Sequence, residues 1–179
     1  MALKEWASLV RALREGRQAI LLRKGGIRDA NGVFTLQEKE FFLYPTLEHQ
    51  KDHLVQACWA GELAASRRDY PSDKTILIDT YAVAENIRVV SSEREFPALL
   101  KHSVWSLDYF QQRWEYKPEK PLYLVGVRAY RLKTPHRIPE APSYAGCVSW
   151  VPLEKELATG PSEPAIENEA FDREMRELF

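Results

Sequence analysis

Residues 20–50, ILLRKGGIRDANGVFTLQEKEFFLYPTLEHQ, carry the pattern from which we predict the fold. Residues 18–22 are rich in aliphatic side chains and short, which is typical of a buried strand. A cluster of Asp, Asn and Gly separates this strand from a second one at residues 33–36, and a third strand at residues 40–44 ends at Pro45. The stretch therefore predicts neighbouring strands with a hairpin-like connection.

The rest of the sequence alternates helical and β patterns. Leu3, Trp6, Val10 and Leu13 follow helical spacing, and Gly16 is expected to end that helix. Further helices are predicted from Leu47 onward and at residues 91–100, 105–113 and 171–178, and further strands at residues 75–79, 83–90, 122–132 and 146–151. This order excludes an all-helical fold and lacks the regular spacing of a doubly wound sheet. We predict an α+β protein with a mixed, partly closed sheet or barrel flanked by helices.

Length and composition indicate one globular domain. A chain of 179 residues can bury a core without disulfides or metals. Its two cysteines have no CxxC spacing, and the charged N-terminal segment does not resemble a signal peptide, so we predict a cytoplasmic protein without a membrane span. Residues 1–153 are assigned to the α+β domain and residues 154–179 to an acidic C-terminal tail with a short helix.

Charge is unevenly distributed along the chain, although the net charge is only -1. Residues 154–179 contain eight acidic and three basic side chains, which leaves residues 1–153 with a surplus of about four positive charges. The protein lacks the global basic field of histone-like binders. Any contact with nucleic acid must therefore come from a local basic site.

The end of the first predicted strand offers such a site. Arg23 and Lys24 are followed there by Gly25, Gly26 and Arg28. Guanidinium groups bind phosphate or carboxylate through two parallel hydrogen bonds, and a glycine backbone can approach an anion closely. The alternative is a turn that needs positive φ at a glycine and leaves the cations solvated. The GxxxxGK(S/T) pattern of a P-loop is absent.

A second candidate group follows the third predicted strand. Thr46 is expected to cap a helix that begins at Leu47, and His49 and His53 would share one face of that helix, as two metal ligands do. The HExxH pattern is absent, and a capped helix start with polar side chains bonded to nearby backbone is the favoured alternative. From this segment the candidate ligand-binding residues are Tyr44, Thr46, Glu48, His49 and Gln50.

A third group combines aromatic and basic side chains at helical spacing. His102, Trp105, Tyr109 and Arg113 can line one helix face, and aromatic rings with arginine form the platforms on which bases stack. The same stripe is more often part of a core. We favour the core for Trp105 and Tyr109 and keep His102 and Arg113 as site candidates, because charged groups are seldom buried without a partner.

Three sequence blocks resemble the bacterial family known as domain of unknown function 1802: ALKEWASLVRALREGRQAILLRKGGI, FFLYPTLEHQ, and HSVWSLDYFQQRWEYKPEKPLYLVGVRAYRL followed by YAGCVSWV. The resemblance spans residues 2–153 and implies no established activity. The segment EGRQAILLRK also resembles the ASCH and PUA-like barrels, in which a helix, a glycine and basic residues line a cleft that binds RNA or nucleotides. That resemblance implies a barrel-like sheet with Gly16, Arg17 and Arg23 at the cleft.

Together these patterns predict a protein that binds an anionic ligand, nucleic acid or a nucleotide, with no cofactor and no membrane partner. The alternative is a metal-dependent phosphodiester hydrolase that uses Glu40, Glu48 and His49 around a divalent ion. A third hypothesis is an interaction module whose acidic tail covers the basic face. All three depend on whether remote segments bring their charged groups into one pocket.

Overall fold

The computed structural model describes residues 1–25, 27–30, 33–146 and 148–179. Its strands are β1 (Ala2–Trp6), β2 (Ile20–Arg23), β3 (Ile27–Ala30), β4 (Val33–Leu36), β5 (Glu40–Thr46), β6 (Thr75–Val89), β7 (Tyr123–Pro139), β8 (Trp150–Val151) and β9 (Ser162–Pro164). Its α-helices are α1 (Ala7–Arg14), α2 (Ala60–Arg68), α3 (Phe96–Leu100), α4 (Leu107–Glu115) and α5 (Asn168–Leu178), and short 3-10 turns lie at Asp52–Leu54, Ala57–Trp59, Glu93–Glu95 and Pro142–Tyr144. In the part of the chain that is described, every helix is too short or too polar to cross a membrane.

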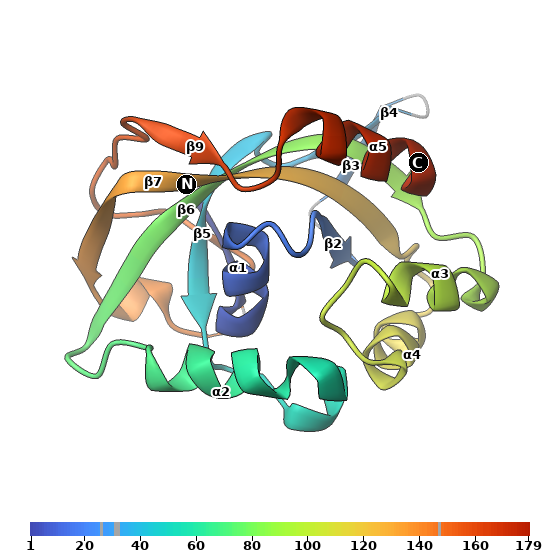
Figure 1. Ribbon diagram of the computed structural model, residues 1–179, viewed down its shortest axis with the longest axis horizontal. Coiled ribbons are helices and arrows are strands. Elements are labelled where there is room, and N and C mark those ends of the chain that lie inside the picture. Colours follow the sequence, from blue (N-terminus) through green and yellow to red (C-terminus); the bar gives the residue numbers. More distant parts are fainter. Residues whose placement is uncertain (26, 31–32, 147) are drawn as a thin grey trace.

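Seven strands form one mixed sheet in the order β2-β7-β6-β5-β1-β8, with β9 paired to β7. The pairing of β1 with β5 is parallel, whereas the other pairs are antiparallel. The long strands β6 and β7 bend around the core, and their register shifts between Ile78 and Thr80 and between Ala84 and Asn86 (Figure 1). The predicted α+β class with a mixed sheet is confirmed. The barrel is wrong, because β2 at one end of the strand order does not pair with β8 at the other.

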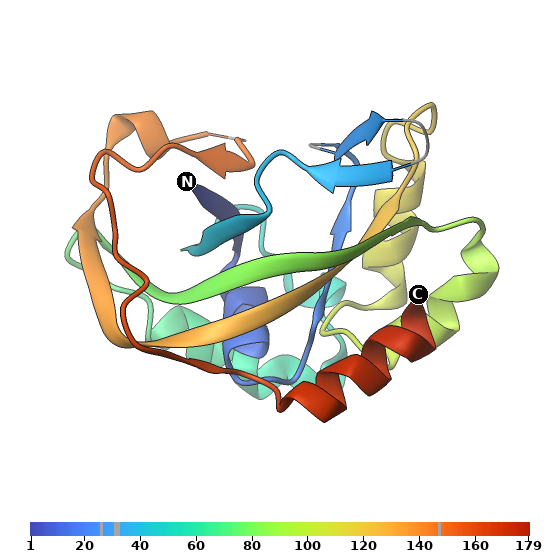
Figure 2. The same cartoon turned by 90° about the horizontal axis from the view of Figure 1, so that it is seen from above.

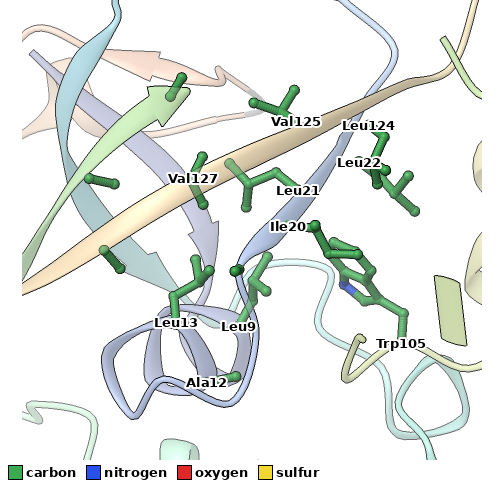
Figure 3. Packing of buried hydrophobic residues seen from close by; sticks show 14 of the residues in the cluster. Leu9, Ala12, Leu13, Ile20, Leu21, Leu22, Trp105, Leu124, Val125 and Val127 are labelled. Atoms are coloured by element: carbon green, nitrogen blue, oxygen red, sulfur yellow. The ribbon is translucent and has the colours of Figure 1, made fainter. Parts of the chain in front are cut away.

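The core lies between the curved sheet and the helices. Leu9 and Leu13 of α1 point toward Val127 of β7 and Leu21 of β2, and Trp105 lies on the other side of β2 in the same cluster (Figure 3). Each of these five side chains is buried. Burial of apolar surface stabilises the fold by roughly 25 cal/mol per Å² removed from water, so this cluster fixes α1 against the sheet.

The C-terminal segment is packed against the rest of the molecule. β9 pairs with β7, and α5 buries Phe171, Met175 and Leu178 in the same core cluster. α5 lies on the side of the β6–β7 pair opposite to α1 (Figures 1 and 2). Gly126 makes this approach possible, because a Cβ added there would lie 2.4 Å from the Met175 sulfur. The helix predicted at residues 171–178 is therefore present, and its apolar stripe belongs to the core.

Two predicted helix starts are wrong for the same reason. Residues 2–6 form β1, because their backbone pairs with β5, and the helix begins only at Ala7. No helix begins at Leu47, since His49 adopts a φ of 59° and the buried Gln50 side chain accepts hydrogen bonds from the backbone and hydroxyl of Ser8. In both places tertiary pairing overrides the local helical pattern.

Candidate functional site

A cavity of about 570 Å³ opens where the two ends of the sheet approach each other without pairing. Its walls come from segments far apart in the sequence: the end of β1, the end of β2, the turn after β5, one face of α4 with the loop that follows it, and the loop before β8. α4 lies beside β2 in both views (Figures 1 and 2). The volume falls in the range of pockets that hold small ligands, about 300 to 1,000 Å³.

An ion pair joins the two walls inside this cavity. Arg23 Nη1 at the end of β2 donates to Glu5 Oε1 of β1 over 2.7 Å, and the two side chains are only 9% and 13% exposed. Burial raises the pKa of the Glu5 carboxyl, and the nearby Arg23 and Arg113 guanidinium groups oppose that rise. The ion pair thus connects strands that share no backbone hydrogen bonds.

Arg113 projects from α4 into the same cavity and is not neutralised in the same way. Within the described residues, no hydrogen bond or ion pair engages its guanidinium. Its Cζ lies 5.8 Å from the centre of the Tyr116 ring, and its charge acts on Glu5 through space. Arg113 can therefore donate hydrogen bonds to a ligand without first breaking an ion pair.

Lys24 has a different role from the arginine that precedes it. Its Nζ donates to the backbone carbonyls of Trp114 at 2.9 Å, Lys120 at 2.9 Å and Lys117 at 3.4 Å. These carbonyls lie at the end of α4 and in the following loop, where a cation also complements the helix dipole. Burial lowers the pKa of this lysine. Lys24 therefore holds the loop that carries two other lysines of the cavity, Lys117 and Lys120.

The turn after β5 supplies the opposite rim. Thr46 Oγ1 accepts a hydrogen bond from the Glu48 backbone N–H at 3.1 Å, and His49 follows in the left-handed region, which side chains other than glycine seldom adopt. Glu48 lies 3.5 Å from Lys4 Nζ, which also donates to the carbonyls of Tyr144 and Gly146. The Glu48 charge is thus balanced by a neighbouring lysine.

The cavity has a strong excess of basic groups. The described residues that line it include two carboxylates, Glu5 and Glu48, and six permanent cations: Lys4, Arg23, Lys24, Arg113, Lys117 and Lys120. Both carboxylates have cationic partners. Three other acidic residues, Glu93, Glu115 and Glu119, line a neighbouring cavity that shares Lys24 and Lys120. The positive potential inside the cavity is therefore only partly cancelled.

The aromatic stripe of α4 belongs mainly to the core. Trp105 is 1% exposed, and Tyr109 stacks on it with ring centres 4.9 Å apart and planes 9° from parallel. Trp6 meets Tyr109 edge to face at 5.1 Å. Burial raises the pKa of Tyr109 to about 12, so its hydroxyl stays protonated at neutral pH. The favoured core placement of Trp105 is confirmed, and Tyr109 both packs on it and reaches the cavity wall.

The structure brings together seven of the predicted site residues, all of which line the cavity: Arg23, Lys24, Gly25, Thr46, Glu48, His49 and Arg113. Tyr44 lies in an adjoining pocket with Lys4 and Glu48. Gln50 is buried against Ser8, and His102 is bound to Glu174 of α5 at 3.0 Å, so neither lines the cavity. Gly26 and the side chain of Arg28 lie outside the described residues.

The residues proposed for a divalent ion do not meet. Tyr81 donates a hydrogen bond to Glu40, and Glu40 is not among the residues that line the cavity, whereas Glu48 and His49 are. In the described part of the chain, no three His, Cys, Asp or Glu side chains gather as metal ligands do.

Several lining residues were not predicted from the sequence. Glu5 and Trp6 lie in the segment that the sequence predicts as helical, and Tyr116, Lys117 and Lys120 are not among the predicted site residues. The segment RWEYKPEK at residues 113–120 does interleave basic and aromatic residues, which is a pattern typical of nucleic-acid contacts. That local signal could have identified the loop, whereas nothing local identifies Glu5.

Comparison with known proteins places this architecture in a family. The model of the family described as "Domain of unknown function (DUF1802)" matches residues 2–177, nearly the whole chain. The chain belongs to the DUF1802 family. The resemblance of the three sequence blocks is confirmed, and the match includes α5.

Two further comparisons give less. No curated protein matches this DUF1802 chain. Among solved structures, it is similar to a crystal structure of a ZmASCH mutant protein from Zymomonas mobilis, with 11% sequence identity and a TM-score of 0.43. That alignment covers 71% of this chain and 66% of the other, just under two thirds of its length.

Proposed function

We propose that this protein binds an anionic ligand, nucleic acid or a nucleotide, in the cavity between β1, β2 and α4. The observation that carries the proposal is the Arg113 guanidinium, which faces the cavity without a bonded partner among the described residues. A charged group that is partly removed from water costs free energy unless it is paired. An anionic ligand would supply the missing partner.

The arrangement of cations favours phosphate over a metal or a neutral ligand. Arg113, Lys117 and Lys120 line the same wall, and no described carboxylate forms an ion pair with any of the three. Arginine offers two parallel hydrogen bonds to phosphate oxygens, and lysine adds charge without fixed geometry. A group that carries negative charge on several oxygens fits this wall.

The aromatic content of the cavity favours a nucleotide over inorganic phosphate. Trp6 and Tyr109 line it together with the cations. Bases pack on aromatic rings and on guanidinium planes, with about 1 to 3 kcal/mol for each stacked base. We therefore infer that the ligand joins a phosphate to a planar ring.

Removal of the Arg113 charge tests the proposal directly. We expect Arg113→Gln to weaken binding of fluorescein-labelled RNA and DNA pentamers by at least about 10-fold, because about 1.4 kcal/mol of interaction corresponds to a factor of ten. Fluorescence anisotropy measures the affinity. The slope of log affinity against log salt concentration should also become shallower by about one, which is the change that the loss of one phosphate contact predicts.

Arg176→Gln is the matched control. Arg176 is exposed on α5 and does not line the cavity, and its substitution by glutamine removes the same charge. Its affinity should stay within about 2-fold of the wild type, since long-range effects of one surface charge are screened by salt. Equal losses in both variants, or no binding by the wild type, would refute a site at this cavity. EDTA should leave binding unchanged.

A further inference from the structure

Tyr116 is a large aromatic residue at the rim of the cavity that the core does not use. It is 50% exposed, directly follows α4, and lines the cavity between Arg113 and Lys117. Large aromatic side chains in a globular protein normally bury most of their surface. We therefore expect that a ligand packs on the exposed part of this ring.

Two cations flank this ring. The Arg113 Cζ lies 5.8 Å and the Lys117 Nζ 5.1 Å from the centre of the Tyr116 ring. Both distances are within the range of cation–π attraction, and the two positive groups lie over the ring. A base stacked on Tyr116 would take the place of one of these cations, which would stay close enough to bind a phosphate of the same strand.

The backbone that carries Tyr116 is held in place by hydrogen bonds. The Tyr116 backbone N–H donates to the Gln112 carbonyl at 3.0 Å, and the Lys120 N–H donates to the Lys117 carbonyl at 2.9 Å. Lys24 further binds the carbonyls on either side of Tyr116. An ordered backbone loses little conformational entropy on binding, so more of the stacking free energy contributes to affinity.

The other rings of the site differ from Tyr116. One face of Tyr109 is covered by Trp105, and Trp6 meets Tyr109 edge to face. Trp6 and Tyr109 thus pack against other rings, whereas Tyr116 lines the same cavity with half of its surface exposed. The site therefore offers an exposed ring at Tyr116 in addition to the more buried rings of Trp6 and Tyr109.

We propose that the ligand is a single-stranded nucleic acid, with one nucleotide in the cavity and the base of an adjacent nucleotide stacked on Tyr116. This inference rests on the proposed function and narrows it from nucleotides in general to oligonucleotides. A duplex hides the faces of its bases, so only an unpaired strand can stack on an exposed ring. The cations beside Tyr116 bind the phosphates that join the two nucleotides.

The experiment compares a labelled pentanucleotide with the corresponding nucleoside monophosphate for the wild type, Tyr116→Ala and Tyr116→Phe. Anisotropy measures pentamer binding, and competition measures monophosphate binding. We expect Tyr116→Ala to weaken pentamer binding by about 5-fold to 100-fold, as the loss of one stacked base predicts, and to leave monophosphate binding within about 2-fold. Tyr116→Phe keeps the ring and should bind both probes like the wild type.

The outcomes separate this inference from the proposed function. If the wild type binds the monophosphate as tightly as the pentamer, or if Tyr116→Ala weakens both probes equally, the rim platform is refuted while nucleotide binding stands. If neither probe binds the wild type, the proposed function itself fails. A duplex of the same sequence should bind at least about 10-fold more weakly than the single strand, and equal affinity would overturn the inference. RNA and DNA pentamers are measured in parallel to identify the preferred sugar.

Discussion

Lys24→Met provides the sharpest test of how the site is held together. The substitution keeps an apolar stem but removes two hydrogen bonds of 2.9 Å and a weaker one of 3.4 Å to the carbonyls of Trp114, Lys120 and Lys117. A hydrogen bond from a charged group contributes about 1.5 to 3 kcal/mol net. Lys24 is 7% exposed, and burial lowers its pKa, so the variant recovers part of the desolvation cost. We expect a net loss of about 2 to 4 kcal/mol in the free energy of unfolding.

Thermal and urea unfolding, followed by circular dichroism, measure this loss. For a chain of this size, 1 kcal/mol shifts Tm by about 2 to 4 °C, so the Lys24→Met variant should melt about 4 to 16 °C below the wild type. Lys120→Met is the matched control, because it removes the same charge from an exposed side chain of the loop. It should change Tm by less than about 2 °C. If Lys24→Met and Lys120→Met have the same Tm, the hydrogen bonds from Lys24 to these carbonyls do not stabilise the fold.

Two further predictions concern the cavity charge and α5. Burial raises the pKa of Glu5 above its usual 4.5, so the carboxyl is neutral below the raised pKa and adds a negative charge to the cavity as pH rises through it. Pentamer affinity of the wild type should therefore fall with rising pH relative to that of Glu5→Gln, and parallel pH profiles of the two proteins between pH 4.5 and 8 would contradict this. Gly126→Ala would place a Cβ 2.4 Å from the Met175 sulfur and should cost about 1 to 3 kcal/mol in urea unfolding; Met175→Ala should relieve most of that added cost in the double variant, and additive losses would argue against the contact.

Elements defined by local patterns were predictable from the sequence. The aliphatic run that became β2 and the strand at residues 33–36, which is β4, follow from their apolar residues. The hairpin predicted between these two strands is wrong, because β2 pairs with β7 and β4 pairs with β3. The helical turn after Ser92 follows from its capping box with Glu95, which the structure contains. In each case the residues that determine the element are neighbours in the chain, so a short window contains the necessary information.

Elements defined by remote pairing were not predictable in this way. β1 has helical spacing of its apolar residues, and only its parallel pairing with β5, about forty residues away, makes it a strand. The predicted break between residues 79 and 83 is absent, because Thr80, Tyr81 and Ala82 pair with β7 and the register shift lies before them, between Ile78 and Thr80. Nothing within a window of ten or twenty residues distinguishes these cases.

In the candidate site, too, the sequence identifies single side chains but does not identify the remote groups that they contact. The sequence predicts Arg23 and Lys24 as two cations of one anion site. Arg23 ends β2 and Lys24 follows it, and the first meets Glu5 of β1 while the second meets carbonyls at the end of α4 and in the loop after it. Their partners belong to segments that the sequence alone cannot place.

Two kinds of cation therefore line the cavity, and they come from different segments. One kind is bound to other groups of the protein, and the other kind faces the cavity without an ion-pair partner. Arg23 and Lys24 connect β2 to β1 and to the α4 loop, which fixes the walls of the cavity. Arg113 and Lys117 lie on the wall so fixed, and no described carboxylate neutralises them. A site needs both kinds of cation, since groups that bind a ligand must first be held in position by groups that do not. This distinction explains why loss of Lys24 should reduce stability, whereas loss of Arg113 should reduce binding and leave the fold intact.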